Sequence, residues 1–399
     1  MEIYLFKLNG WSSNFDERIV ALSKSVDSLV IFRSRPDGES NVSSLEGVSV
    51  VDIPPTRGTF VTPGWVKPFV FFLHVFFAVV AALAMMLKKR RRPDAVHALD
   101  YILGGFSAML TATASRVPLV VSVRGLKEPA YRNMVSESGT RRARVNYRIL
   151  VTLSRLIIPR AAHIVTKAEY QREFVRETYG VTCGFTTAPT GVDFETFDPA
   201  RVPPGNPYEA LFSDVPVDLD DSTIVLYLGK FLPRKGFDRL VEFVEELDDD
   251  LPEDVVFIAV GGFRDESFER RLSGRLDALG TRFLVHSERV DFEDVPALLA
   301  TADATTLLSE PANEGVPRVL QESCAMQTPI VAADVTGIAR AFDGLPGCTL
   351  VDRDDSTAFE AAIYDVRESR PEMPRNVFRE RFDITSNYAK YADAYAAVQ

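Results

Sequence analysis

The chain has 399 residues, of which 46% are hydrophobic, and this length suits two domains of roughly 200 residues each. Its 45 basic and 56 acidic residues give a net charge of −11, which argues against a nucleic-acid partner. Only ten basic residues are lysine, and acidic residues gather in runs at 218–221 and 245–250. An acidic, lysine-poor surface suits high salt and predicts a halophilic archaeal source, although a genome rich in G and C also produces an arginine bias.

The first half of the chain alternates strands and helices, which predicts a parallel sheet. Residues 2–8 (EIYLFKL) read as the first strand, because they lack the charged start and long apolar core of a signal peptide. The cysteines, Cys183, Cys324 and Cys348, have no metal-like spacing and fit a reducing cytoplasm. We expect strands at 28–33, 48–53, 95–99, 118–123 and 163–166, and helices near 15–24, 104–114 and 168–179.

Residues 69–87 form an apolar segment without formal charge, and five cations follow it at 88–92. A helix of this length measures about 28 Å, close to the hydrocarbon thickness of a bilayer. A spanning helix is not expected, because the strands before and after it should share one sheet and would lie on opposite sides of the membrane. Two interpretations remain. The helix is buried against the sheet and a partner subunit, or, as we favour, residues 69–92 lie in the membrane interface with the cations at the headgroups.

A second basic cluster precedes the apolar stretch 149–158. It consists of Arg141, Arg142, Arg144 and Arg148. These side chains either bind an acceptor phosphate or lipid headgroups, or form a solvated helix face, which we favour. Of the four histidines, His74, His97 and His163 lie in apolar or strand segments and suit core packing.

The second half of the chain opens with a buried strand at 223–229 (TIVLYLG), and the loop after it carries Lys230, Arg234 and Lys235 before a helix. Cations at the carboxyl end of a parallel strand are placed for a ligand, because open α/β sheets bind ligands at that edge. A charge-assisted bond from lysine to a diphosphate contributes roughly 1.5–3 kcal/mol when partly desolvated. The alternative is a solvated basic turn.

The stretch 309–333 places Glu314 and Glu322 around a loop-to-helix junction between two buried strands. We expect the helix to begin at Pro317 and end near Gln327. Unpaired N–H groups at its start suit a phosphate or a sugar hydroxyl, and the Glu322 carboxylate suits the hydroxyls of a ribose. The alternative is a pair of solvated charges that cap a helix.

Together these segments resemble glycosyltransferase family 4, the retaining nucleotide-sugar transferases of the GT-B fold. The likeness is carried in chain order by 189–193 (PTGVD) with Phe197, 230–236 (KFLPRKG), 257–262 (FIAVGG), 290–302 (VDFEDVPALLATA) and 314–323 (EGVPRVLQES). It implies an α/β protein with two Rossmann-like parallel-sheet domains that face a central cleft. The expected parts are an acceptor-side domain (1–200), a linker (201–221), a nucleotide-sugar-binding domain (222–380) and a final helix within 381–399 that crosses back to the first domain.

The resemblance also implies roles for matched residues. Lys230 and Lys235 would neutralise the donor diphosphate, and with Glu314 they are the expected catalytic residues. Glu322 would hold the ribose hydroxyls. The backbone N–H groups of Gly315, Val316 and Arg318 would also contact the donor. Near His286, Arg289 and Val290 would contact the nucleobase. Gly10 would lie in the first phosphate loop.

In this family the leaving phosphate helps to deprotonate the incoming hydroxyl, and cationic side chains stabilise the charge without a metal or other cofactor. The expected donor is a UDP- or GDP-linked sugar. The expected acceptor is a glycan or a polyprenyl-linked lipid, which would place the enzyme in the cytoplasm at the inner face of the cell membrane.

Three positions depart from the family pattern. Lys230 stands where the family usually has an arginine. Its ammonium group is a point charge and not a two-pronged guanidinium, so the geometry of the bound diphosphate is less fixed. Arg124-Gly125 stands where many members have a histidine, which makes Arg124 a candidate acceptor contact. The first phosphate loop holds a single glycine, Gly10, where the family frequently has a pair. A non-catalytic, sugar-nucleotide-binding scaffold subunit of a membrane complex therefore stays open, as does a phosphorylase.

Overall fold

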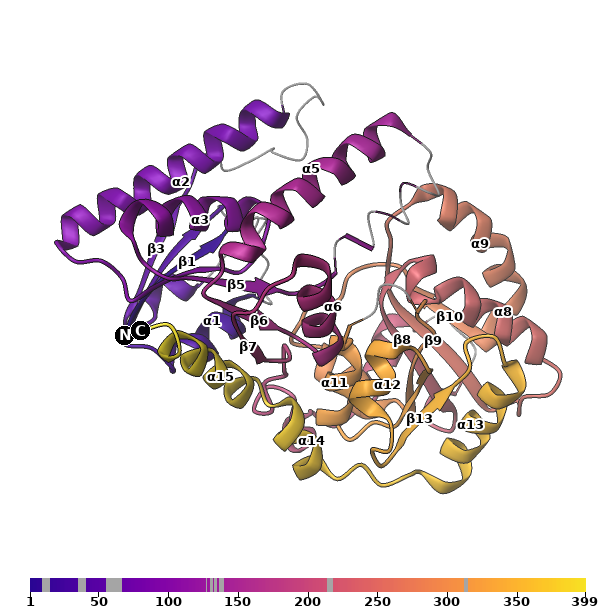
Figure 1. Ribbon diagram of the computed structural model, residues 1–399. Helices are drawn as coiled ribbons and strands as arrows, with labels where there is room; N and C mark the ends of the chain where they lie inside the picture. Colours follow the sequence, from indigo (N-terminus) through magenta and orange to yellow (C-terminus); the bar gives the residue numbers. More distant parts are fainter. Residues whose placement is uncertain are drawn as a thin grey trace. The chain divides into compact units, whose positions relative to one another are not determined.

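The structure is a computed structural model that describes residues 1–8, 15–34, 41–54, 67–126, 128–129, 132, 135, 140–213, 218–311 and 315–399. The chain divides into two compact units. The first unit comprises Met1–Thr190 and Ile384–Gln399, and the second comprises Gly191–Asp383 (Figure 1). This division falls before the predicted linker at 201–221, because Val192, Phe194 and Phe197 are already buried in the core of the second unit.

The first unit is built on a seven-stranded sheet in the order β3-β2-β1-β4-β5-β6-β7. All neighbouring strands run parallel, and Tyr4 of β1 lies opposite both Val30 of β2 and Val96 of β4. The strands are β1 (Glu2–Lys7), β2 (Ser28–Arg33), β3 (Val48–Asp52), β4 (Ala95–Ala98), β5 (Leu119–Val123), β6 (His163–Thr166) and β7 (Gly184–Thr187). The helices are α1 (Asp16–Ser23), α2 (Lys67–Lys89), α3 (Leu103–Ser115), α5 (Arg141–Ile157), α6 (Glu169–Tyr179) and α15 (Ile384–Ala396).

Side chains along each central strand alternate between two helical layers. Tyr4 and Phe6 of β1 face the layer that contains α2, α3, α5 and α6, whereas Ile3 and Leu5 face α1 and α15. Figure 1 shows α2, α3 and α5 on one side of this sheet and α15 on the other. The strands are therefore buried on both faces, as a helix-covered parallel sheet requires.

The last helix, α15, packs within the first unit through a buried polar contact. His97 of β4 is fully buried, and its Nδ1 lies 2.7 Å from the Tyr395 hydroxyl. Its Nε2 lies 2.8 Å from the Ser122 hydroxyl. Burial, and then the nearby Arg124 guanidinium, lower the pKa of His97 to about 3, so the ring is neutral near pH 7. This histidine serves the core, as its place in a strand predicts.

The second unit holds a six-stranded parallel sheet in the order β10-β9-β8-β11-β12-β13. Strand β8 is longer than the predicted strand and includes Lys230, which lies opposite Gly262 of β9. The strands are β8 (Thr223–Phe231), β9 (Val255–Phe263), β10 (Phe283–His286), β11 (Ala304–Leu307), β12 (Ile330–Ala333) and β13 (Cys348–Val351). The helices are α7 (Pro207–Leu211), α8 (Phe237–Leu247), α9 (Glu266–Leu279), α10 (Val295–Thr301), α11 (Arg318–Ala325), α12 (Thr336–Phe342), α13 (Ser356–Ser369) and α14 (Arg375–Phe382).

Candidate functional site

The carboxyl ends of the strands in the second unit bring two predicted donor residues, Lys230 and Arg289, to one edge of the sheet. Lys230 lies near the end of β8, where the Tyr227 hydroxyl donates to the Lys230 carbonyl over 2.9 Å. Arg264 follows β9 directly, and Arg289 follows β10. Because these strands are parallel, the edge collects side chains from segments that are distant in sequence.

Four other cations lie near enough to the Lys230 ammonium group to repel it. The pKa of Lys230 is lowered from its ordinary value, first by partial burial and then by repulsion from these neighbours. In order of effect the neighbours are Arg264, Arg234, Lys235 and Arg289. Such a cluster stabilises a bound polyanion such as a diphosphate. Sequence reasoning missed Arg264, whose signal was its place two residues after the family-like segment 257–262 (FIAVGG).

The loop after β8 is fixed against the end of β11. The Glu310 N–H donates to the Arg234 carbonyl over 3.1 Å. Gly236 has a φ of +71°, and a Cβ there would lie 1.8 Å from the Leu308 carbonyl oxygen. Only glycine permits this close approach. The short 3-10 helix Pro233–Lys235 therefore lies beside the segment that leads to α11.

Helix α11 begins one residue later than predicted. Pro317 has a ψ of 135° and forms the extended N-cap, so the first helical residue is Arg318 and the last is Ala325. The buried Gln321 side chain donates to the Val316 and Pro317 carbonyls at 3.2 and 3.3 Å. It fixes the backbone just before the helix, where we expected Gly315 and Val316 to hold the donor sugar.

Glu322 and Arg318, both predicted donor residues, form an ion pair on α11. The Arg318 Nε lies 2.6 Å from the Glu322 Oε1, and the side chains are only 16% and 9% exposed. The Arg318 guanidinium also lies 5.4 Å from the centre of the Phe292 ring. The alternative of two solvated capping charges is therefore wrong for Glu322, which is a buried, paired carboxylate.

The remaining donor predictions fall in three places. Glu314 and Gly10 lie outside the described residues, so their roles stay predictions. Arg289 is an exposed member of the cation cluster, and Val290 packs partly buried against the core. His286 ends β10 and lies edge-on to Phe212, with 6.4 Å between ring centres.

The first unit has a cationic site of its own, at the carboxyl edge of its sheet. The Arg124 guanidinium, just after β5, lies 4.8 Å from the centre of the Phe15 ring. Lys7 and Arg18 lie 5.1 and 5.0 Å from the same ring. The Arg124 Nη1 is buried and has no hydrogen-bond partner within the described residues. Sequence reasoning named only Arg124; the missed signal was Lys7 at the end of the first strand.

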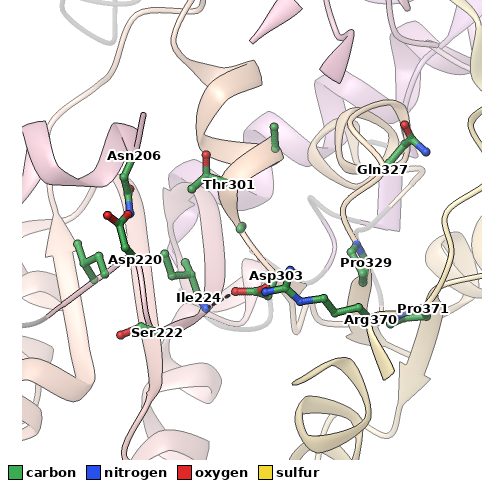
Figure 2. Close-up of a pocket in the computed structure, with 13 residues that line it drawn as sticks. Asn206, Asp220, Ser222, Ile224, Thr301, Asp303, Gln327, Pro329, Arg370 and Pro371 are labelled. Carbon is green, nitrogen blue, oxygen red and sulfur yellow. Dashed lines mark hydrogen bonds and ion pairs between the residues drawn. The ribbon is translucent and has the colours of Figure 1, made fainter. Parts of the chain in front are cut away.

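A separate cavity of about 330 Å³ lies at the opposite, amino-terminal edge of the second sheet (Figure 2). There Asp303 accepts from the Ile224 N–H over 2.8 Å and pairs with Arg370, also over 2.8 Å. The charged groups of Asp303 and Arg370 in this cavity are therefore already paired with each other. Over the part of the chain that the structure describes, no group of three His, Cys, Asp or Glu side chains is placed to hold a metal ion.

Two family descriptions match the chain in the predicted order. Residues 18–182 match "Glycosyl transferase 4-like domain", and residues 222–369 match "Glycosyl transferases group 1". The chain belongs to the family 4 glycosyltransferases. The predicted resemblance and the predicted enzyme class are thus confirmed at the level of the family.

This family 4 glycosyltransferase is 28% identical over 215 residues to the GDP-mannose-dependent alpha-(1-6)-phosphatidylinositol monomannoside mannosyltransferase of Mycolicibacterium smegmatis. It is 30% identical over 217 residues to the D-inositol 3-phosphate glycosyltransferase of Xylanimonas cellulosilytica. These matches cover 51% and 52% of this chain, and 53% and 50% of the relatives. The chain therefore spans about half the length of the curated relatives that it matches.

Solved structures agree over nearly the whole family 4 glycosyltransferase chain. Anabaena HepE in complex with UDP and glucose covers 100% of both chains, with a TM-score of 0.72 and 16% identity. Sucrose-phosphate synthase from Thermosynechococcus elongatus covers 99% of this chain and 94% of its own, with a TM-score of 0.69 and 18% identity. At such identities the likeness shows the fold, and it confirms the predicted GT-B class with two Rossmann-like parallel sheets.

Proposed function

We propose that this protein transfers a sugar from a nucleotide-diphosphate donor to a phosphate-bearing, lipid-linked acceptor, with retention of the anomeric configuration. The observation that carries the donor half is the cluster around Lys230 at the carboxyl edge of the second sheet. Its charge and its position suit a diphosphate better than any neutral ligand.

The family resemblance supplies the proposed roles of the donor residues. Lys230 and Lys235, together with Glu314, would act on the reacting group. As the bond between the anomeric carbon and the phosphate oxygen breaks, the two ammonium groups would neutralise the charge that develops on the leaving nucleoside diphosphate. The acceptor oxygen forms the new bond to the anomeric carbon, and its proton passes to the leaving phosphate. No metal or other cofactor is needed in this scheme.

The other donor contacts hold the substrate in place. Glu322 would accept bonds from the ribose hydroxyls, oriented by its ion pair with Arg318. The N–H groups of Gly315 and Val316, at the positive end of α11, would hold the donor sugar. Pro317 has no N–H to give.

A donor linked to UDP or GDP is proposed because similar proteins carry those nucleotides in their names. The mycolicibacterial relative is named GDP-mannose-dependent, and Anabaena HepE was solved with UDP-glucose. Thermal unfolding should be measured against UDP, GDP, ADP and their sugar conjugates, since a ligand that binds only the folded state raises the melting temperature. One responsive nucleoside would support the proposal, whereas no response from folded protein would contradict it.

The acceptor half rests on the cations around Phe15 in the first unit. Arg124 brings a buried Nη1 to this site, and Lys7 and Arg18 add further positive charge. Both curated relatives have phosphate-containing compounds in their names. We therefore assign the acceptor phosphate to Arg124 and its neighbours, in glycan, glycolipid or glycoprotein synthesis at the inner face of the cell membrane.

Transfer assays can test this acceptor class. With a donor identified, polyprenyl phosphates and phosphoinositides should accept sugar, and their dephosphorylated forms should not. Arg124→Ala should raise the KM for the acceptor and leave donor binding unchanged. Donor binding without transfer to any lipid extract would contradict the catalytic proposal and favour a scaffold subunit. Activity that persists after treatment with a chelator is expected from a metal-independent mechanism.

A further inference from the structure

Helix α2 presents an apolar stripe to solvent along its length. Phe72, Phe76 and Leu87 are 62%, 59% and 79% exposed, and Val80 continues the stripe between them. The spacings of four, four and seven residues keep these side chains on one face of the helix, over about 22 Å. The opposite face is buried against the sheet and α3 by His74, Val75, Ala78, Ala82 and Met86.

The same helical layer carries the other exposed apolar side chains. Leu110 of α3 and Val145 and Ile149 of α5 are also exposed, and these helices lie beside α2 on one side of the first sheet (Figure 1). Among the described residues, every large apolar side chain that is exposed belongs to α2, α3 or α5. Exposed apolar side chains gathered in one helical layer indicate an interaction site.

Cations border this apolar surface at two places. Within the described chain, Lys88, Arg90 and Arg92 form no ion pair, whereas Lys89 pairs with Glu2 and Arg91 with Asp94. On α5, Arg141 and Arg148 are exposed on the same face as Val145 and Ile149. Unpaired cations beside apolar side chains, in a chain of net charge −11, point to an anionic partner.

The sheet topology decides how α2 can meet a membrane. By length and composition α2 is able to cross a bilayer. However, β3 before it and β4 after it are strands of the same parallel sheet, separated only by β2 and β1. A spanning helix would place these strands on opposite sides of the bilayer. Helix α2 must therefore lie along the membrane surface if it meets one.

We infer that the α2–α3–α5 layer is a docking surface for an anionic lipid bilayer, with α2 parallel to the membrane plane. The apolar stripe enters the interface, and the cations at 88–92 and on α5 meet the headgroups. A second copy of the chain suits this surface less well than an anionic membrane, because it would bring the same cations to the interface and no opposite charge. The inference goes beyond the proposed transfer reaction, because docking requires neither donor nor acceptor.

Vesicle binding of the full chain, without nucleotide, tests this inference. In the lowest salt that keeps the protein folded, vesicles of phosphatidylglycerol should bind more protein than vesicles of phosphatidylcholine. The variant Phe72→Ser/Phe76→Ser should reduce binding by at least about tenfold, because the bound apolar area falls. Since both side chains are exposed, its melting temperature should match that of the native protein.

A matched pair of charge reversals separates headgroup contact from general electrostatics. Lys88→Glu/Arg92→Glu should remove the preference for phosphatidylglycerol. Arg270→Glu/Arg271→Glu, which changes exposed arginines on α9 by the same net charge, should keep it. Phe76→Trp fluorescence should be quenched by brominated lipids, as expected for a helix that lies in the interface.

Three results would overturn the docking surface. The first is a native protein that binds neither vesicle. The second is binding that survives both the Phe72→Ser/Phe76→Ser and the Lys88→Glu/Arg92→Glu changes. The third is a dimer that binds no vesicle and dissociates when Phe72 and Phe76 are changed, which would show that a second copy covers the stripe. Loss of transferase activity alone would affect none of these measurements.

Discussion

Lys235 is a partly exposed ammonium group at the edge where the donor diphosphate is proposed to bind. Lys235→Ala should weaken nucleotide-sugar binding by about ten- to a hundredfold, because a charge-assisted bond to phosphate contributes roughly 1.5–3 kcal/mol. Calorimetric titration with the nucleotide measures this change. Lys24→Ala, which removes an exposed lysine from the first unit, is the control and should bind normally. Equal affinity in both variants would remove the basis of the site assignment.

Glu322 has a structural role as well as its proposed role in ribose binding. Its ion pair with Arg318 is largely buried, so Glu322→Ala removes a buried ion pair and should lower both donor affinity and the melting temperature. A double-mutant cycle with Arg318→Met should give a coupling free energy of about 1–3 kcal/mol in urea unfolding. A coupling near zero would show that the two side chains contribute independently.

His97 should make the free energy of unfolding depend on pH. Its folded-state pKa of about 3 lies below its ordinary value of 6.5, so only the unfolded chain binds this proton between those values. Stability is therefore lost as pH falls through this window, by at most about 1.4 kcal/mol per pH unit from this group. Urea unfolding of native protein and His97→Gln at several pH values measures the difference. Parallel pH profiles would contradict the buried, neutral histidine.

At the scale of elements, the hydrophobic pattern of the sequence predicted where the strands lie. Contacts made in the folded chain determined where the elements end. The strand at 163–166 was predicted with its observed bounds, because apolar residues between polar ones mark a buried parallel strand. Strand β8 continues beyond its predicted end because β9 pairs with it as far as Phe231. Helix α11 stops at Ala325, short of the predicted Gln327, which has a φ of +62° and cannot continue a helix.

The junction of β8, α8 and β11 depends on a single glycine. Gly236→Ala should lower the melting temperature and weaken donor binding, because a Cβ would meet the Leu308 carbonyl and the residue needs a positive φ. The matched control is Gly274→Ala in α9, where nothing lies within 4 Å of the added atom. That change should be neutral, or stabilise by up to about 1 kcal/mol. Equal effects of both changes on nucleotide binding would show that the loop tolerates displacement.

At the scale of the whole molecule, the charge of −11 predicts a dependence on salt. Repulsion between excess like charges destabilises the compact state. Salt screens this repulsion, because the Debye length falls to about 3 Å at 1 M. The melting temperature should therefore rise with KCl, as expected of a protein from a high-salt organism. Sucrose at matched osmolarity is the control for preferential exclusion. A melting temperature that is constant or falls with KCl would contradict both the charge argument and the proposed source.

The sequence by itself determined the family and the parallel α/β architecture, and it named most of the candidate donor residues. These follow from local patterns, since strand ends in a parallel sheet fix where Lys230 and Lys235 must lie. Only the tertiary structure decided which groups meet. It added Arg264 to the cluster, paired Glu322 with Arg318, and collected the exposed apolar side chains into one layer. Such contacts depend on the packing of segments far apart in the chain, which no local pattern encodes.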